Sequence, residues 1–278
     1  MFRRAGERPL IMGILNITPD SFSDGGKYQD IERAFTQVQQ MLAEGADIID
    51  IGGESSRPGA ESVAIAEQLH RVLPVIQKIR QSYSENLLIS IDTTQSAVAL
   101  AALESGVNII NDISAGSADA RMLQVAAEQH AGIILMHMQG TPQTMQENPT
   151  YDDVVQQILD YLLVKVDAAL QAGISSERIA IDPGIGFGKR KRDNLALLAN
   201  LQRFTISGYP VLLGTSRKRF MGNICQVDKP ADLVTATAVT TALGVMAGVR
   251  LFRVHDVQEN RQAADVAWAI LKSQKADP

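Results

Sequence analysis

The sequence is poor in cysteine and in aromatic residues. Of its 278 residues one is a cysteine, Cys225, and only 5% are aromatic. A single cysteine excludes an internal disulfide framework and gives no sign of an oxidising compartment. Because 45% of the residues are hydrophobic and so few are aromatic, we expect a core of aliphatic side chains and alanine. Such a core is typical of parallel α/β architecture.

Excess positive charge and long hydrophobic runs are also missing. The formal net charge is −5, which argues against general binding to nucleic acid or to a membrane surface. No run approaches the ~18 apolar residues of a membrane span, and the beginning, MFRRAGERPL, has no apolar signal-peptide core. We therefore expect a cytoplasmic protein with neither a nucleic-acid nor a membrane partner.

Several catalytic motifs are absent as well. GIGFGK (184–189) lacks the G-x-G-x-x-G spacing of a dinucleotide site, and no P-loop motif occurs. The four histidines show no zinc-hydrolase spacing, and there is no G-x-S-x-G nucleophile elbow. These absences disfavour dinucleotide enzymes, P-loop nucleotide hydrolases, zinc hydrolases and serine hydrolases.

Eight short aliphatic runs recur along the chain, and each ends in polar or glycine residues. They cover residues 10–18, 47–54, 87–93, 108–114, 132–138, 179–184, 210–216 and 250–256. Nearly continuous Ile, Leu and Val runs are expected for strands that are covered on both faces. Segments with helical spacing lie between them, for example 34–47 and 154–173, and the last is 258–274.

Eight strands that alternate with eight helices predict an α/β protein with a (β/α)₈ TIM barrel. A doubly wound open sheet shows the same alternation. The eight units and the lack of any internal boundary favour the barrel. We expect a single domain over residues 1–278, with a short N-terminal extension at 1–9.

Polar side chains follow nearly every predicted strand. They are Asn16, Glu54 to Arg57, Asp92, Asn111, Asp112, His137, Asp182, Ser216 to Lys218, Arg253 and His255. Because the loops after barrel strands share one face, these residues predict a site there. Helix capping is the alternative for Asp92 and Ser216, each of which precedes a polar turn.

Arg253 and His255 are two residues apart on one predicted strand, so both side chains share a face. An arginine fork beside an imidazole suits phosphate oxygens, and Asn16 and Arg57 could join from neighbouring strands. The alternative is a salt bridge from Arg253 to Asp256 or to Asp50.

Two acids, Asp92 and Asp182, each end an apolar run and should be shielded from water. A shielded carboxylate suits a guanidine-like edge with two N–H donors, such as the aminopyrimidine of a pterin, and Asn111 matches a mixed heterocycle edge. Lys218 could donate to a ring carbonyl or to a phosphate. A purely structural ion pair remains the alternative for either acid.

With these residues assembled, the chain resembles the dihydropteroate synthase family over essentially its whole length. The matching stretches are NITPDSFSDGG (16–26), GADIIDIGGESSRPGA (45–60), SIDT (90–93), NIINDIS (108–114), MHMQGTPQTMQ (136–146), DPGIGFGK (182–189), GTSRKRFMG (214–222) and RVHDV (253–257). There is one for each strand end, in order.

The resemblance implies a TIM barrel, commonly a homodimer, that condenses 6-hydroxymethyl-7,8-dihydropterin diphosphate with 4-aminobenzoate and uses Mg²⁺. It assigns the pterin to Asp92, Asn111, Met136, Asp182, Phe187, Gly214 and Lys218. It assigns the diphosphate to Asn16, Ser56, Arg57, Arg253 and His255, with Asn16 on the metal. It assigns 4-aminobenzoate to Phe22, Pro58, Phe187, Ser216 and Lys218. Asp92, Lys218, Arg253 and His255 would be the catalytic residues.

In this family diphosphate leaves first and the arylamine captures the resulting pterin-methyl cation. The acidic stretch 16–26 is then interpreted as a lid over that cation, with Phe22 closing on the arylamine. Ser56, where the family usually has Thr, and Arg219, where a smaller residue is common, are departures from the pattern. Two other functions compete: a corrinoid-dependent pterin methyltransferase and a pterin-binding protein without activity.

Overall fold

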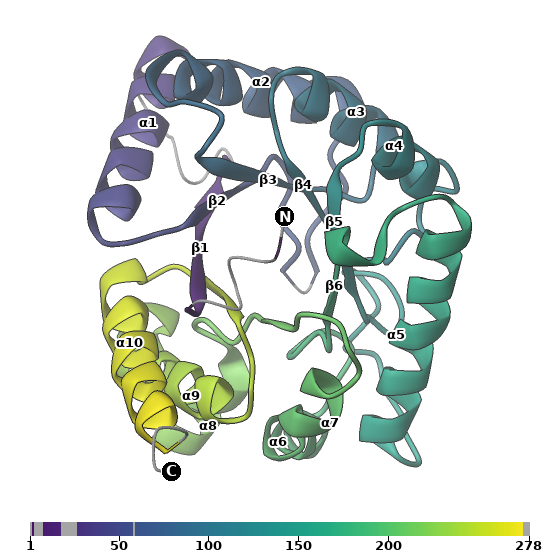
Figure 1. Ribbon diagram of the computed structural model, residues 1–278, viewed down its shortest axis with the longest axis vertical. Helices are drawn as coiled ribbons and strands as arrows, with labels where there is room; N and C mark the ends of the chain where they lie inside the picture. The colour runs from purple at the N-terminus through teal and green to yellow at the C-terminus, as the bar shows by residue number, and fades with distance from the viewer. Residues whose placement is uncertain (1, 3–7, 18–26, 58, 275–278) are drawn as a thin grey trace.

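The computed structural model describes residues 2, 8–17, 27–57 and 59–274. Its strands run parallel in the order β6-β5-β4-β3-β2-β1-β8-β7. They are β1 (Leu10–Asn16), β2 (Ile48–Gly52), β3 (Leu88–Asp92), β4 (Ile109–Asp112), β5 (Gly132–Met136), β6 (Ile179–Asp182), β7 (Leu212–Leu213) and β8 (Leu251–Val254). A parallel bridge between Ile181 and Val211 joins the two ends of the sheet. The fold is therefore the predicted (β/α)₈ barrel (Figure 1).

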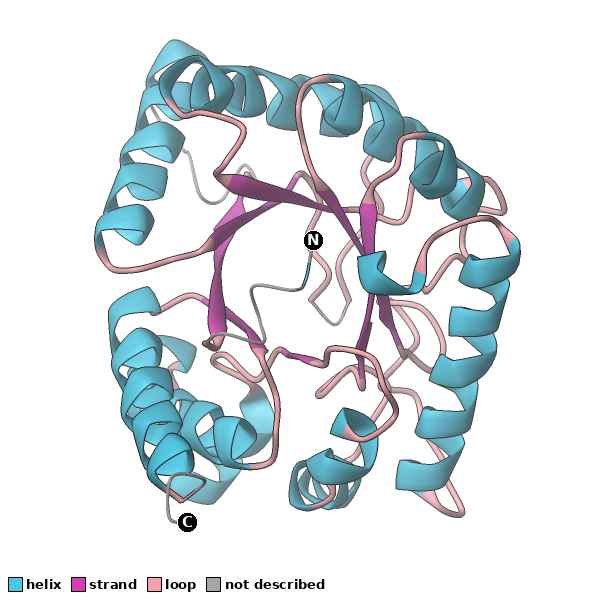
Figure 2. Ribbon diagram, viewed as in Figure 1, coloured by secondary structure: helices cyan, strands magenta, loops and turns pink. Residues whose placement is uncertain are grey.

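Helices surround the ring of strands on the outside (Figure 2). They are α1 (Lys27–Ala43), α2 (Ile65–Ser82), α3 (Ser96–Glu104), α4 (Met122–Glu128), α5 (Val154–Gln171), α6 (Lys191–Ala199), α7 (Leu201–Thr205), α8 (Arg219–Cys225), α9 (Val234–Met246) and α10 (Val257–Ser273), with short 3₁₀ turns at Ser176–Arg178 and Pro230–Asp232. None of the described helices has both the length and the apolar character that crossing a membrane requires.

The alternation of one helix per strand is wrong at two places. Both α6 and α7 follow β6, because Asn200 leaves helical geometry (φ −119°, ψ 23°) between them. Both α8 and α9 follow β7, because Gln226 ends α8 in the left-handed region (φ 58°). Asn200 alone separates α6 from α7, whereas residues 226–233 separate α8 from α9. A single-residue break such as that at Asn200 does not disturb the hydrophobic spacing from which helices are predicted.

The strands are shorter than the aliphatic runs that predict them. The run at 210–216 contains only a two-residue strand, Leu212–Leu213. Its last residues leave the sheet and turn into the loop that carries Ser216. Aliphatic composition therefore marks the buried segment correctly and overestimates its hydrogen-bonded length.

The inside of the barrel is apolar at one end and polar at the other. The apolar end holds inward-facing side chains from the strands, together with Phe2 from the chain's beginning: Leu10, Met12, Ile48, Ile109, Ile134, Ala180, Leu212 and Leu251. Two residues further along a strand the next inward side chain appears, and several of these are charged, as with Asp50 after Ile48 and Arg253 after Leu251. The site therefore lies over the carboxyl ends of the strands.

Candidate active site

Arg253 is the centre of an ion-pair network at the polar end of the barrel. Its Nε donates to Oδ2 of Asp50 and its Nη2 to Oδ2 of Asp92, each at 2.6 Å. Burial would lower the pKa of this guanidinium, but the two carboxylates outweigh it and hold the pKa above its usual value. Of the two alternatives considered for Arg253, the pairing with Asp50 is confirmed and the pairing with Asp256 is wrong.

Asp92 ends β3 and is buried, as its apolar run predicts. Burial raises the pKa of its carboxyl to about 7, Arg253 opposes the rise and the charge of Asp50 adds to it. Helix capping is wrong for this residue, because α3 begins after Gln95 and the Ser96 N–H is capped by Asp119. Asp92 is thus a shielded carboxylate at the barrel mouth.

Asn111 is the cross-strand partner of Asp92 and is equally buried. Its Nδ2 donates to Oδ2 of Asp50 at 3.3 Å. This bond fixes the amide so that Oδ1 is the free acceptor, and that buried oxygen has no hydrogen-bond partner among the described residues. The arrangement offers an acceptor to any N–H donor placed against it.

Asp182 ends β6 and lies across the mouth from Asp92. The Gly184 N–H donates to its Oδ1 at 2.6 Å. Burial raises its pKa to about 6, while that hydrogen bond and the nearby cations, Lys218 first, work against the rise. Gly214 lies beside both charged side chains of the mouth, because a Cβ at this position would be 3.9 Å from Asp182 Oδ2 and 4.0 Å from Arg253 Cβ, which is ordinary contact.

Lys218 and Phe187 are stacked together. The Lys218 Nζ lies 4.0 Å from the centre of the Phe187 ring, a cation–π contact. Burial and the charge of Arg253 lower the pKa of Lys218 to about 8, with Asp182 and Asp92 in opposition. Phe187 also packs with Met136, Ile113 and Met145 in a small apolar cluster, which gives the site an apolar wall beside its acids.

Ser216 and His255 are joined by a hydrogen bond, although the family resemblance assigns them to different substrates. The Ser216 Oγ lies 2.9 Å from His255 Nδ1 and accepts the His255 backbone N–H at 3.1 Å. Burial and four nearby cations, Arg253 first, lower the pKa of His255 to about 3. Capping is also wrong for Ser216, because α8 begins after Lys218.

Sequence reasoning missed Lys189 as part of the site's support. This buried lysine donates to the Phe187 carbonyl at 2.9 Å, to the His137 carbonyl at 3.3 Å and lies 3.0 Å from His137 Nδ1. Burial lowers the pKa of Lys189 to about 7, and burial with Lys189 lowers that of His137 to about 3. His137 therefore supports the loop that carries Phe187. The signal was the lysine that closes the DPGIGFGK match.

From the sequence, Asp50 is expected only as a structural salt-bridge partner of Arg253. It stands in the middle of an apolar strand, at an inward position between Ile48 and Gly52, and is fully buried. An isolated acid at such a position needs a partner inside the barrel. The need of an inward-facing acid for a buried partner is the sequence feature that predicts a place for Asp50 in the site.

The other expected diphosphate residues lie around this network. Asn16 ends β1, opposite Gly52 in the strand register, and is partly exposed. Arg57 is exposed and close enough for its charge to lower the pKa of His255. Ser56 lines the neighbouring cavity. Phe22, Pro58 and most of the acidic stretch 16–26 lie outside the described residues.

A cavity of about 350 Å³ opens beside Asp92. It is formed by the loops after β2, β3, β4 and β5, with lining residues that include Glu54, Ser56, Thr93, Ile113, Ser114, Met138 and Thr141. Its volume is in the range of small-molecule sites, roughly 300–1,000 Å³. A ligand of substrate size can therefore reach the Asp92 carboxylate.

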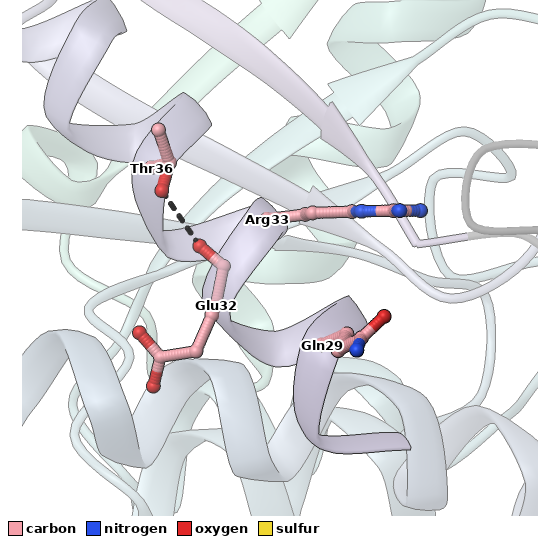
Figure 3. Close-up of a pocket in the computed structure, with 4 residues that line it drawn as sticks. All are labelled: Gln29, Glu32, Arg33 and Thr36. Carbon is pink, nitrogen blue, oxygen red and sulfur yellow. Dashed lines mark hydrogen bonds between the residues drawn. The ribbon is translucent and has the colours of Figure 1, made fainter. Parts of the chain in front are cut away.

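A second hollow, of about 410 Å³, lies on α1 and is lined by Gln29, Glu32, Arg33 and Thr36 (Figure 3). These residues all come from one helix. Glu32 is paired with Lys78 of α2, and the Thr36 hydroxyl donates to the Glu32 carbonyl. None of the residues at the barrel mouth lines it, so it adds nothing to the site.

Dihydropteroate synthases are among the known proteins that this chain is similar to. A dihydropteroate synthase from Synechocystis is 44% identical over 265 residues, covering 95% of this chain and 91% of that protein. The Clostridium difficile dihydropteroate synthase crystallised in the presence of pteroic acid is 42% identical with a TM-score of 0.89, covering 95% of this chain and 97% of that one. The Xanthomonas albilineans dihydropteroate synthase with 4-aminobenzoic acid is 40% identical with a TM-score of 0.88, and the match covers 98% of this chain and 95% of that one.

The chain spans about half the length (55% and 50%) of the mitochondrial folate synthesis bifunctional proteins of Pisum sativum and Arabidopsis thaliana, which it also matches. Residues 12–255 match the family described as pterin binding enzyme. That range contains all eight strands apart from the first residues of β1. The barrel, its polar mouth and these matches agree with the resemblance seen in the sequence: this chain belongs to the family of pterin binding enzymes, among the dihydropteroate synthases.

Proposed function

We propose that this chain condenses 6-hydroxymethyl-7,8-dihydropterin diphosphate with 4-aminobenzoate to give 7,8-dihydropteroate and diphosphate. The observation that carries the proposal is the pair of buried carboxylates, Asp92 and Asp182, at the barrel mouth. Asn111, the strand partner of Asp92, adds a buried Oδ1 that has no hydrogen-bond partner among the described residues. Two acids and an acceptor match the N–H donors of an aminopyrimidine ring. The family match supports the same substrate class.

The pterin ring would be held by polar edges and one aromatic face. Asp92, Asn111 and Asp182 would receive its N–H groups, and Lys218 would donate to a ring oxygen or nitrogen. Phe187 and Met136 would line its plane, because they form the apolar wall beside the acids. The same carboxylates would stabilise the cation that forms when diphosphate leaves, since preorganised charges act strongly in a site from which water is excluded.

His255 would bind the diphosphate as a neutral hydrogen-bond donor. Ser216 Oγ accepts the His255 backbone N–H, so its single hydroxyl proton is available for Nδ1. With Nδ1 as the acceptor, the proton of the imidazole would be on Nε2, and the pKa of about 3 keeps the ring neutral. Nε2–H would donate to phosphate oxygen, and Arg57 and Arg253 would supply the positive charge.

Mg²⁺ would accompany the diphosphate. Among the described residues no group of three or more histidine, cysteine or acidic side chains could hold a metal by itself. Mg²⁺ is commonly bound by few protein oxygens together with substrate phosphates and water, and the Asn16 side-chain oxygen at the end of β1 fits that role. When bound, the ion would neutralise charge on the leaving diphosphate.

The test is a coupled assay of purified protein with both substrates. We expect dihydropteroate and diphosphate to form only when the pterin diphosphate, 4-aminobenzoate and Mg²⁺ are all present. Methyl transfer from a methylated folate to a corrinoid would identify the methyltransferase instead. Calorimetric binding of pterin without any product would identify a non-catalytic binding protein.

We further propose that the protein is a cytoplasmic homodimer that uses α9 and α10. Helix α9 (VTATAVTTALGVM) lies on the surface but contains no charged residue. Val239 and Leu243 of this helix are 53% and 62% exposed, and Val266 and Ile270 of the neighbouring α10 are also exposed. Exposed apolar side chains on two packed helices are typical of an interface with a second copy.

A further inference from the structure

Asp50 is fully buried in the middle of β2, yet it contacts Asn111 of the proposed pterin site and Arg253 of the proposed diphosphate site. Its Oδ2 accepts from Arg253 Nε at 2.6 Å and from Asn111 Nδ2 at 3.3 Å. Because Asp50 lies one inward position below the strand end, the ligand cavity does not include it. Asp50 can therefore affect the reaction through these two hydrogen-bonded neighbours and through its charge, which also acts on Asp92.

The guanidinium of Arg253 donates hydrogen bonds to two acids, one below the barrel mouth and one at it. Nε is bonded to Asp50, below the mouth, and Nη2 is bonded to Asp92, which lines the cavity. A ligand whose N–H group binds Asp92 at Oδ2 competes with Nη2 for that oxygen. It does not compete for the bond between Nε and Asp50.

We propose that Asp50 is a positioning residue that keeps Arg253 in the site while the substrate occupies Asp92. Asp50 is the permanent counter-charge and Asp92 is the exchangeable one. The exchange releases Nη2 toward the substrate without leaving the buried arginine unpaired, a state that is costly in a protein interior. This inference rests on the proposed function, because the ligand at Asp92 is the pterin of that reaction.

Asp50→Asn isolates this role. The amide carbonyl that the substitution introduces can still accept from Asn111 Nδ2, so the orientation of Asn111 is kept. The charge that balances Arg253 is lost, and Asp92 becomes its only carboxylate partner. A pterin must then displace the arginine from its last hydrogen-bonded carboxylate, and binding weakens.

The measurements are calorimetric binding of 6-hydroxymethylpterin and steady-state kinetics with both substrates. For D50N we expect the pterin Kd and the KM for the pterin diphosphate to rise about tenfold or more, as for other disrupted buried charge pairs. The KM for 4-aminobenzoate should stay as in the wild type. In an Arg253→Gln background, where there is no arginine to hold, D50N should change the pterin Kd by less than about threefold, because only coupled residues show non-additive effects.

Ser90→Ala is the matched control. Ser90 is the strand-register partner of Asp50, is fully buried, and its hydroxyl has no hydrogen-bond partner among the described residues. We expect S90A to bind pterin as the wild type does. Wild-type pterin binding by D50N, or an equal loss with and without Arg253, would overturn the proposal, since Asp50 would then act through packing alone.

Folding is checked by circular dichroism, and D50N keeps Asp92 as a partner for Arg253. If D50N does not fold, Asp50→Glu keeps the counter-charge and moves it by one methylene; a pterin Kd within about threefold of the wild type is expected, and a tenfold rise in folded D50E would contradict a role through charge. Wild-type protein that binds pterin but makes no dihydropteroate would refute the proposed function and leave this binding test intact.

Discussion

The hydroxyl of Ser216, after β7, lies 2.9 Å from Nδ1 of His255, after β8, and accepts the backbone N–H of the same histidine. Two loops that end neighbouring strands are thereby joined by one side chain. The proposed donation from the serine hydroxyl to Nδ1 would place the proton of the neutral His255 ring on Nε2. A residue that sequence analysis placed with 4-aminobenzoate therefore also orients a residue placed with diphosphate.

Removing that hydroxyl should release the histidine. In Ser216→Ala we expect His255 to populate both neutral tautomers, whereas the wild type keeps the proton on Nε2 through the neutral pH range. Nitrogen-detected NMR of histidine-labelled protein measures this directly. The KM for the pterin diphosphate should rise about threefold to thirtyfold, the usual range for one lost hydrogen bond to a ligand-binding group. Ser273→Ala, at the exposed end of α10, is the control and should leave both readings unchanged.

Replacement of Asp92 by Asn should lower turnover far more than it lowers stability. It removes a proposed pterin ligand and a charge that stabilises the cation, so we expect kcat to fall about a hundredfold or more, as for other lost electrostatic contacts. Circular dichroism should show a folded protein. Wild-type turnover in this folded variant would exclude Asp92 from catalysis.

The same variant should change how stability depends on pH. Burial raises the pKa of Asp92 to about 7 in the folded protein, whereas an exposed aspartic acid has a pKa of about 3.9. The stability that Asp92 contributes is complete below the lower value and is lost as pH rises through the higher one. The uncharged amide of D92N has no such loss. From about pH 5 to pH 8 the free energy of unfolding of D92N should therefore rise relative to the wild type, on the order of a few kcal/mol; parallel denaturant curves would contradict the raised pKa.

Gly184 should not tolerate a side chain. It has φ +67°, and a Cβ there would lie 1.9 Å from the His137 carbonyl oxygen. Gly208 has φ +94° with nothing near its Cβ position, so it shares the backbone strain but not the clash. We expect Gly208→Ala to cost about 1–2 kcal/mol and Gly184→Ala at least about 2 kcal/mol more, as in overpacked cores. Equal losses in thermal or denaturant unfolding would show that backbone strain alone matters.

A charge on the exposed face of α9 should separate the proposed dimer. Leu243→Glu introduces a carboxylate at a position whose leucine side chain is 62% exposed. The monomer fold should therefore be retained, while burial of the charge against a second copy becomes costly. Sedimentation equilibrium should give the mass of two chains for the wild type and of one chain for the variant. Val164→Glu, on the exposed face of α5, is the control and should leave the mass unchanged. A monomeric wild type would refute the dimer.

The sequence by itself determined the barrel and most of the composition of its mouth. Eight aliphatic runs of the right spacing, each followed by polar residues, require strands that are buried on both faces and loops that collect at one end. Asp92 and Asp182 could be recognised as shielded because each ends such a run. These features are local or periodic, so the chain order is enough to read them.

Only the tertiary structure decided how the charges are paired. Arg253 is 203 residues from Asp50 and 161 from Asp92, and Ser216 is 39 residues from His255; closure of the barrel brings them within hydrogen-bond distance. Pairing also decides which groups are free, such as Asn111 Oδ1, and which are held, such as His255 Nδ1. Electrostatics inside a barrel depends on distances between strands, and no pattern along one chain encodes them. The sequence therefore supplied the groups of the site, and the fold assigned each one its partner.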